Sequence, residues 1–197
     1  DGAYKDDGNP KDMDYTKFLN GYSVSGDEII FENSHVIDLN GDYNSGVVIN
    51  NNAAARNTGI ININGEGGIG LFTGDGTGVL ENTESGIINV SNSGIGMATA
   101  GWPYNNFTGS IRNDGTITIN GSGTGISISG DIDTDGGIAE NRGKIELNGG
   151  GDSIGVYVGE YNTFTNYGEI IGTTLGTEKT TLISVLNQGQ VINSAEG

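Results

Sequence analysis

Short stretches of alternating apolar and polar residues recur along most of the chain. The clearest have the form Asn-x-Gly-x-Ile-x-Ile-x-Gly and begin at Asn57, Asn113 and Asn141, with Leu147 in place of the second Ile in the last. Weaker copies stand at Gly86, Gly168, Gly189 and, with His35 replacing the glycine, at Ile37 and Leu39. The seven key positions, 35, 59, 86, 115, 143, 168 and 189, are separated by 21 to 29 residues. Self-similarity at such a period is typical of repeat proteins.

Further apolar positions follow each copy of the motif. A second pair comes a few residues later, at Val47/Ile49, Ile69/Leu71, Ile95/Met97, Ile126/Ile128 and Ile154/Val156. A third and less regular patch precedes the next asparagine, at Leu80, Ile111, Ile138, Phe164 and Val185. Each unit is therefore predicted to hold two or three short strands joined by turns.

The repeated strands favour a solenoid over other all-β folds. A unit of two or three short strands cannot bury its apolar face alone, whereas stacked coils pair their strands in parallel and form side-chain ladders along the axis. One such ladder is predicted to contain Ile61, Ile88, Ile117, Ile145, Ile170 and Val191. The recurring Asn and Gly are expected at corners, in left-handed backbone conformations. An antiparallel sandwich also has short strands, but its hairpins would not repeat one residue type at one position. We predict an all-β fold, a right-handed parallel β-helix of about seven coils.

The two ends of the chain differ from the repeats. Residues 1–32 are predicted to be an acidic leader, a loop or an N-terminal cap, with a first strand or a cap between Tyr22 and Phe31. Residues 33–197 hold the β-helix repeats. Because Gly197 falls one strand into a coil with no polar cap, we expect a fragment of a longer repeat array.

Composition agrees with a thin, elongated core, because 37 of 197 residues are Gly and only 34% are hydrophobic. The 25 acidic and 8 basic residues give a net charge of -17, which would repel nucleic acid and anionic membranes. The sequence has no cysteine, which excludes disulfides and thiol catalysis. No apolar run approaches the ~20 residues of a membrane span.

Candidates for catalysis are few, and we predict that the chain is not an enzyme. His35 is the only histidine and occupies a turn position. The run Gly151-Asp152-Ser153 resembles the opening of an esterase motif, but it lies where a strand is expected. Arg56, Arg112 and Arg142 each stand near a coil's Asn corner. Their alignment leaves a polysaccharide-active β-helix enzyme as an alternative.

One pattern suggests a metal ion. Asp131, Asp133 and Asp135 stand at alternate positions before Gly136, as in the first half of a calcium-binding loop. The twelfth position, usually Glu, is Arg142. The alternative interpretation is a solvated acidic insertion. Calcium is the one cofactor that the sequence brings into question, and we otherwise expect none.

Aromatic residues gather in two excursions between repeats. Trp102, Tyr104 and Phe107 fall in the longest gap, the 29 residues from Gly86 to Gly115, and Tyr157 and Tyr161 fall in another. Aromatic side chains supply contact area at low entropic cost, so both groups are candidate binding residues. The alternative is that they cover the apolar interior of the coils.

The motif copies followed by Gly94-Ile-Gly-Met97 or by Ser153-Ile-Gly-Val156 are similar to the passenger repeats of type V autotransporters, particularly the large fusobacterial adhesins. The resemblance covers about Asn33 to Gly197. It implies a passenger secreted through its own C-terminal β-barrel, which this sequence does not contain, and displayed outside the outer membrane of a Gram-negative bacterium. Such passengers attach to surface proteins or glycans of host cells or of other bacteria. The family has no shared binding motif, so no residue's role carries over.

The resemblance, together with the predicted β-helix, implies a surface-displayed adhesin segment. Its expected partner is a protein or glycan of a cell surface, and we expect it to act as a monomer. A polysaccharide-active enzyme, a phage-tail-type β-helix and a purely structural stalk are the alternatives.

Overall fold

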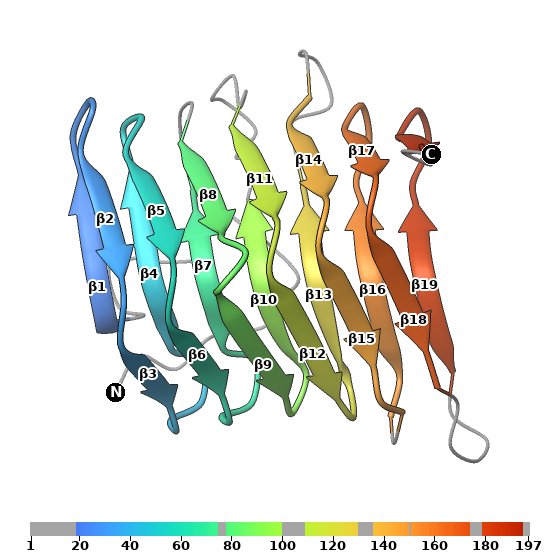
Figure 1. Ribbon diagram of the computed structural model, residues 1–197, viewed down its shortest axis with the longest axis horizontal. Helices are drawn as coiled ribbons and strands as arrows, with labels where there is room; N and C mark the ends of the chain where they lie inside the picture. The colour runs from blue at the N-terminus through green and yellow to red at the C-terminus, as the bar shows by residue number, and fades with distance from the viewer. Residues whose placement is uncertain are drawn as a thin grey trace, which may run out of the picture.

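The computed structural model describes residues 19–74, 78–99, 109–129, 136–149, 151–173 and 179–194. These residues form twenty β-strands wound around one long axis, with successive coils side by side from the N-terminal to the C-terminal end (Figure 1). In this part of the chain, no helix has the length and apolar character needed to cross a membrane.

Three parallel sheets, named A, B and C here, run the length of the molecule, and each coil adds one strand to each sheet in that order. Sheet A contains β1 (Leu19–Ser25), β4 (Ser45–Asn50), β7 (Ile69–Thr73), β10 (Gly94–Thr99), β13 (Gly123–Ile128), β16 (Ser153–Val158) and β19 (Thr180–Val185). Sheet B contains β2 (Ile30–Asn33), β5 (Ala54–Asn57), β8 (Val79–Asn82), β11 (Ser110–Asn113), β14 (Ile138–Asn141), β17 (Thr163–Asn166) and β20 (Gln190–Asn193). Sheet C contains β3 (Val36–Leu39), β6 (Ile60–Ile63), β9 (Ile87–Ser91), β12 (Thr116–Asn120), β15 (Lys144–Leu147) and β18 (Glu169–Gly172).

The predicted fold class is confirmed: the protein is all-β, a right-handed parallel β-helix. The described strands make six complete coils and two strands of a seventh, slightly fewer than the seven repeats of the motif suggested. The difference lies in the last copy. Val191 does not continue the ladder of Ile170 in sheet C, because β20 pairs with β17 and places Val191 beside Phe164 in sheet B. The sequence pattern also placed Val185 in the third apolar patch, together with Phe164. In the structure Val185 belongs to β19 of sheet A.

The first coil begins before the first motif copy. β1 pairs with β4, and β2 pairs with β5, so residues 19–33 contribute strands to sheets A and B. The rings of Tyr22 and Phe31 lie 4.7 Å apart between their centroids at this end of the helix. The stack of strands therefore begins with β1 and β2, and β2 ends at Asn33, where the first motif copy starts.

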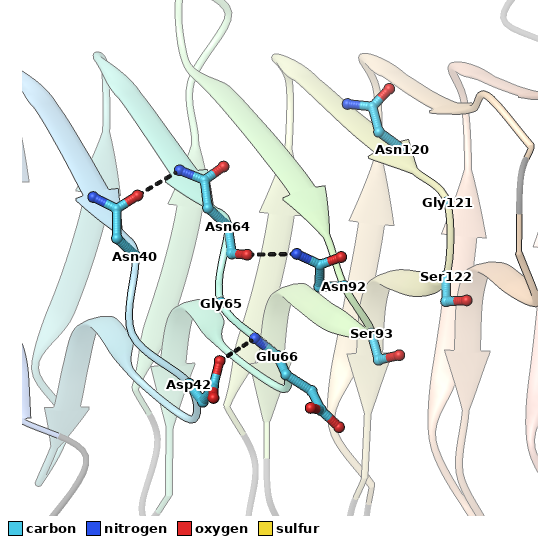
Figure 2. A pocket seen from close by; sticks show the side chains of 10 residues that line it. All are labelled: Asn40, Asp42, Asn64, Gly65, Glu66, Asn92, Ser93, Asn120, Gly121 and Ser122. Carbon is cyan, nitrogen blue, oxygen red and sulfur yellow. Dashed lines mark hydrogen bonds between the residues drawn. The ribbon is translucent and has the colours of Figure 1, made fainter.

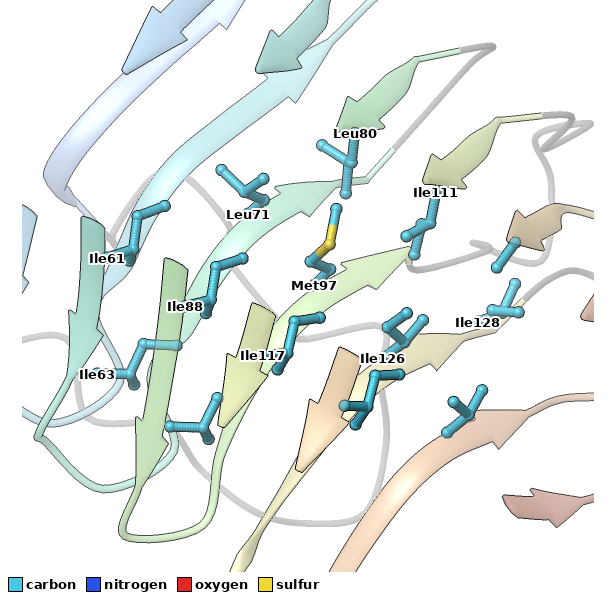
Figure 3. Close-up of a cluster of buried hydrophobic side chains, with 14 of the residues drawn as sticks. Ile61, Ile63, Leu71, Leu80, Ile88, Met97, Ile111, Ile117, Ile126 and Ile128 are labelled. Atoms are coloured by element: carbon cyan, nitrogen blue, oxygen red, sulfur yellow. The ribbon is translucent and has the colours of Figure 1, made fainter. Parts of the chain in front are cut away.

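The core is a narrow column of aliphatic side chains inside the three sheets (Figure 3). In sheet C the predicted ladder is present from Ile61 to Ile170, and each isoleucine is in register with the next. Ile61, Ile88, Ile117 and Ile145 are fully buried, with 0% exposure, and Ile170 is partly buried against the same core. β-Branched side chains suit this position because they pack well on a pleated surface.

Sheet A departs from simple alternation. Ile69 and Ile95 were expected to pair with Leu71 and Met97 on the core side, but they pack instead with a separate cluster of Val48, Phe72 and Ala98. The intervening glycines explain the change. An added Cβ on Gly70 or Gly96 would meet the carbonyl oxygen of the glycine in the next coil at 2.5 and 2.6 Å, and it would also contact isoleucines of sheet C. Only glycine therefore lets sheets A and C approach so closely.

The corner between sheets B and C is built on asparagines, which are buried from Asn33 to Asn166. Asn33, Asn57, Asn82, Asn113, Asn141, Asn166 and Asn193 stack in register, and each side-chain amide donates to Oδ1 of the next over 2.7 to 2.9 Å. The expectation that these asparagines turn the chain in left-handed conformations was wrong, because none of them has a positive φ. They are present because a stacked amide satisfies its own hydrogen bonds within the core.

Candidate binding corners

The three corners of the helix differ in how much their length varies from coil to coil. The B–C connections contain two residues in every described coil except at 83–86. The A–B connections range in length from the shortest, 51–53, to the longest, 100–109. The C–A connections range in length from 92–93 to 173–179. One corner is thus nearly constant in length, and the other two carry loops of changing length on a fixed frame. Loops of that kind are where binding residues concentrate in rigid scaffolds.

Two of the sequence-predicted groups belong to consecutive coils of the A–B corner. Trp102, Tyr104 and Phe107 lie outside the described residues, between the end of β10 and the start of β11. Asp131, Asp133 and Asp135 also lie outside the described residues, between β13 and β14. β10 pairs with β13, and β11 pairs with β14, so the strands that flank the two groups are direct neighbours. The repeat already placed the two groups in successive units, between Gly86 and Gly115 and between Gly115 and Gly143.

The starts of these two connections are tied together by reciprocal hydrogen bonds. The Thr99 hydroxyl donates to the carbonyl oxygen of Ser129 over 3.3 Å and accepts from the Ser129 amide over 3.1 Å. Among the residues that the structure describes, no group of three or more His, Cys, Asp or Glu side chains is placed to hold a metal ion. Calcium binding by the three aspartates stays a prediction.

Tyr157 and Tyr161 lie at the same corner, one coil further on. Tyr157 is half-buried in β16, and Tyr161 is 39% exposed in the connection to β17. Tyr161 has a φ of 60°, a left-handed conformation that is uncommon for a bulky residue. The backbone of Gly136, from the preceding coil, lies directly against the Tyr161 carbonyl oxygen. The amide of Gly137 also donates to Oδ1 of Asn162 over 2.7 Å.

Other candidate residues are not brought together. His35 lies in the first coil, where its Nδ1 is 3.1 Å from the Ser34 hydroxyl. Ser153 lies in β16 of the sixth coil, is buried, and its hydroxyl has no hydrogen-bond partner. Arg56 and Arg112 project from sheet B and are paired with Glu81 and Asp114 at 2.8 and 2.7 Å. Side-chain hydrogen bonds to these carboxylates raise the pKa of both arginines.

A groove of about 540 Å³ lies at the C–A corner (Figure 2). Ten residues line it, and all are polar or glycine: Asn40, Asp42, Asn64, Gly65, Glu66, Asn92, Ser93, Asn120, Gly121 and Ser122. They come from the connections of four consecutive coils and from the last residue of β12.

Differences in loop length explain why the groove forms there. The first two coils connect sheet C to sheet A with five residues, 40–44 and 64–68. The next two coils use two residues, 92–93 and 121–122. Asn92 and Ser93 both adopt left-handed conformations, with φ of 50° and 64°. Two such residues in succession reverse the chain in a tight turn. The short turns leave a recess beside the longer loops.

Hydrogen bonds between coils fix the groove's side chains. The side-chain amide of Asn64 donates to Oδ1 of Asn40 over 2.9 Å. The side-chain amide of Asn92 donates to the backbone carbonyl oxygen of Asn64 over 2.6 Å. The backbone amide of Glu66 donates to Oδ1 of Asp42 over 3.0 Å. Figure 2 shows these three bonds joining the first three coils across the groove.

The groove's lining offers hydrogen-bonding groups and carries a negative charge. Amides and hydroxyls both donate and accept, whereas the carboxylates of Asp42 and Glu66 only accept. None of the ten lining residues is basic. The sequence signal for the groove was an Asn that recurs directly after the last apolar residue of the sheet C strand, as in Asn40, Asn64, Asn120 and Asn148. We expected only the motif's own Asn and Gly at the corners and assigned no role to these positions.

Comparison with protein-family models, with curated proteins and with solved structures finds no match to this chain.

Proposed function

We propose that this protein is a surface-displayed adhesive segment of the autotransporter-passenger type, which attaches to a protein or glycan of a host or bacterial cell. On this proposal it acts outside the outer membrane and as a monomer. The repeat motif and the parallel β-helix are both what such passengers would require. Attachment would depend on the shape and polarity of the surface rather than on a chemical reaction.

The observation that carries the proposal is the contrast between the corners. The B–C corner keeps its buried asparagine ladder and nearly constant length, while the other two corners vary in both length and composition. A scaffold that served only as a spacer would need no such variation. The varied corners include a polar groove on one side and an exposed tyrosine, Tyr161, on the other.

A polysaccharide-active enzyme is the second candidate function, and one observation favours it. Asp42 and Glu66 place two carboxylates in the same groove, and paired carboxylates are what glycoside hydrolysis uses. An enzyme of this kind would release reducing sugar from a polysaccharide panel, and the double variant Asp42→Asn/Glu66→Gln would not. An adhesin would bind without releasing product.

The test of the proposal is attachment of the intact chain to immobilised cell-surface proteins, glycans and whole cells, measured as saturable binding. Three variants separate the surfaces: Asn40→Ala/Asn120→Ala in the groove, Tyr161→Ala at the A–B corner, and Asn89→Ala on the outer face of sheet C as the control. Weaker binding by a corner variant, with the control unchanged, supports adhesion. A folded chain that binds to nothing would favour the structural stalk.

A further inference from the structure

The groove at the C–A corner carries an inference about the chemical class of the partner, and this inference rests on the proposed adhesive function. We propose that the groove binds a neutral, linear glycan that lies across the first four coils, along the axis of the helix. The four asparagines and two serines of the groove would hold its hydroxyl groups.

The first argument is the regular placement of amides. Asn40, Asn64 and Asn120 occupy the position directly after Leu39, Ile63 and Ile119, the last apolar residues of their sheet C strands. Asn92 lies one residue later, because β9 extends to Ser91, which pairs with Asn120. Successive coils of a parallel β-helix are about 4.8 Å apart. That step is close to the length of one sugar residue in an extended chain, so amides on neighbouring coils can meet neighbouring sugars.

The second argument is the supply of unused hydrogen-bonding atoms. Nδ2 of Asn40 and Nδ2 of Asn120 donate to no other described residue, and Oδ1 of Asn92 accepts from none. The asparagine side chains are exposed and are held from behind by bonds to adjacent coils. A sugar hydroxyl both donates and accepts, so it matches a site that presents fixed donors and acceptors together.

The third argument is charge. Asp42 and Glu66 flank the groove, no basic residue lines it, and the whole chain has a net charge of -17. A glycan that carries carboxylate or sulfate groups would be repelled, because like charges in a partly desolvated site have no counter-charge. Neutral sugars lose nothing by this arrangement, and the two carboxylates can accept hydrogen bonds from their hydroxyls.

The experiment uses the intact chain with defined oligosaccharides of three to four residues. One set is neutral, built from hexoses and N-acetylhexosamines, and the matched set carries one uronic or sialic acid each. Saturation-transfer NMR detects contact, and titration gives the dissociation constant. We expect binding to members of the neutral set only. Asn40→Ala/Asn120→Ala should weaken it about tenfold, because two hydrogen bonds are removed.

Three controls make the outcome decisive. Asn89→Ala removes a half-buried amide of sheet C that lies outside the groove and should leave binding unchanged. Asp42→Asn/Glu66→Gln should bring binding of the acidic set closer to that of the neutral set. Each variant's circular dichroism spectrum and thermal melt must match those of the parent chain. If the double alanine variant unfolds, Ser122→Trp, which fills the recess, serves as a second blocking variant.

Different failures point to different errors. Neutral glycans that bind equally well to the groove variants would overturn the assignment of the groove. Attachment to cells without any glycan binding would overturn the glycan class and leave the adhesive function standing. A folded chain that attaches to neither cells nor glycans would overturn the adhesive function as well.

Discussion

The side-chain amide of Asn82 donates a hydrogen bond to Oδ1 of Asn113 over 2.8 Å, and both side chains are completely buried. The second proton of each amide is also used, since Asn82 donates to the Gly86 carbonyl oxygen and Asn113 donates to that of Gly115 over 3.2 and 3.3 Å. A buried polar group costs stability unless all its hydrogen bonds are made. Here the repeat makes them, because each coil supplies the acceptor for the coil before.

Replacing one rung of this ladder should therefore be costly. Asn113→Ala leaves the Asn82 donor and the Asn141 acceptor unpaired inside the core. We expect the free energy of unfolding to fall by about 2–3 kcal/mol, the usual penalty for orphaned buried groups. Urea unfolding followed by circular dichroism measures it. Asn193→Ala is the matched control, because Asn193 is exposed and accepts only from Asn166. Equal losses in the two variants would contradict the ladder's role.

A carboxylate at the same rung should make stability depend on pH. In Asn113→Asp, burial raises the pKa of the new carboxyl in the folded state above its unfolded value of about 3.9. The variant's deficit relative to the parent chain is then smallest below that unfolded pKa and grows as pH rises through it. Unfolding free energies of both proteins at acidic and at neutral pH provide the measurement. A deficit independent of pH would show that the side chain escapes to solvent.

The sequence predicted the solenoid because its periodic isoleucines report directly which face is buried. It misplaced Val185 and Val191 because short apolar pairs look alike, and only strand pairing assigns them to a sheet. It also missed the role of the corner asparagines, since a hydrogen-bonded amide column exists only once coils are stacked in register. The groove depends on length differences between loops of neighbouring coils. Such a recess has no motif of its own.

The glycine column of sheet A should tolerate no side chain. An added Cβ at Gly125 would lie 2.6 Å from the Gly155 carbonyl oxygen and 3.1 Å from Cγ2 of Ile145. Gly125→Ala is expected to lower the unfolding free energy by about 1–3 kcal/mol, as overpacking does in other cores. Gly74→Ala is the control, because its nearest contact would be an ordinary 3.4 Å from the Phe72 ring. Equal melting temperatures for the two variants would contradict the claim that the glycine column tolerates no side chain.

Tyr161 offers a way to separate binding from stability. Its φ of 60° is unfavourable for a bulky residue, but asparagine tolerates this conformation well. We expect Tyr161→Asn to keep or slightly raise the melting temperature while weakening attachment to cells, since the exposed ring is lost. Thermal melts and a cell-binding assay on the same preparation give both values. Unchanged attachment would assign Tyr161 a purely local role.

Charges alternate along the outer face of sheet B. Glu32, Arg56, Glu81, Arg112 and Glu140 occupy equivalent positions on five successive strands. Arg56 contacts Glu81 at 2.8 Å and Glu32 at 3.9 Å, so each positive charge faces negative neighbours in both directions. Cross-strand pairs of opposite charge stabilise a sheet, and like charges directly opposite each other destabilise it.

Reversing one charge in this row should therefore cost stability in a manner that salt can relieve. Glu81→Lys places three positive side chains on consecutive strands, and we expect the melting temperature to fall by a few degrees at low ionic strength. Screening shortens from about 10 Å at 0.1 M salt to about 3 Å at 1 M, so most of the loss should be recovered in concentrated salt. Glu84→Lys makes the same charge change in the exposed turn that follows β8, and it should melt close to the parent chain in both conditions. If Glu81→Lys is equally destabilised at high salt, the destabilisation comes from lost packing rather than from charge. The alternating charges would then not be what stabilises the pairing of these strands.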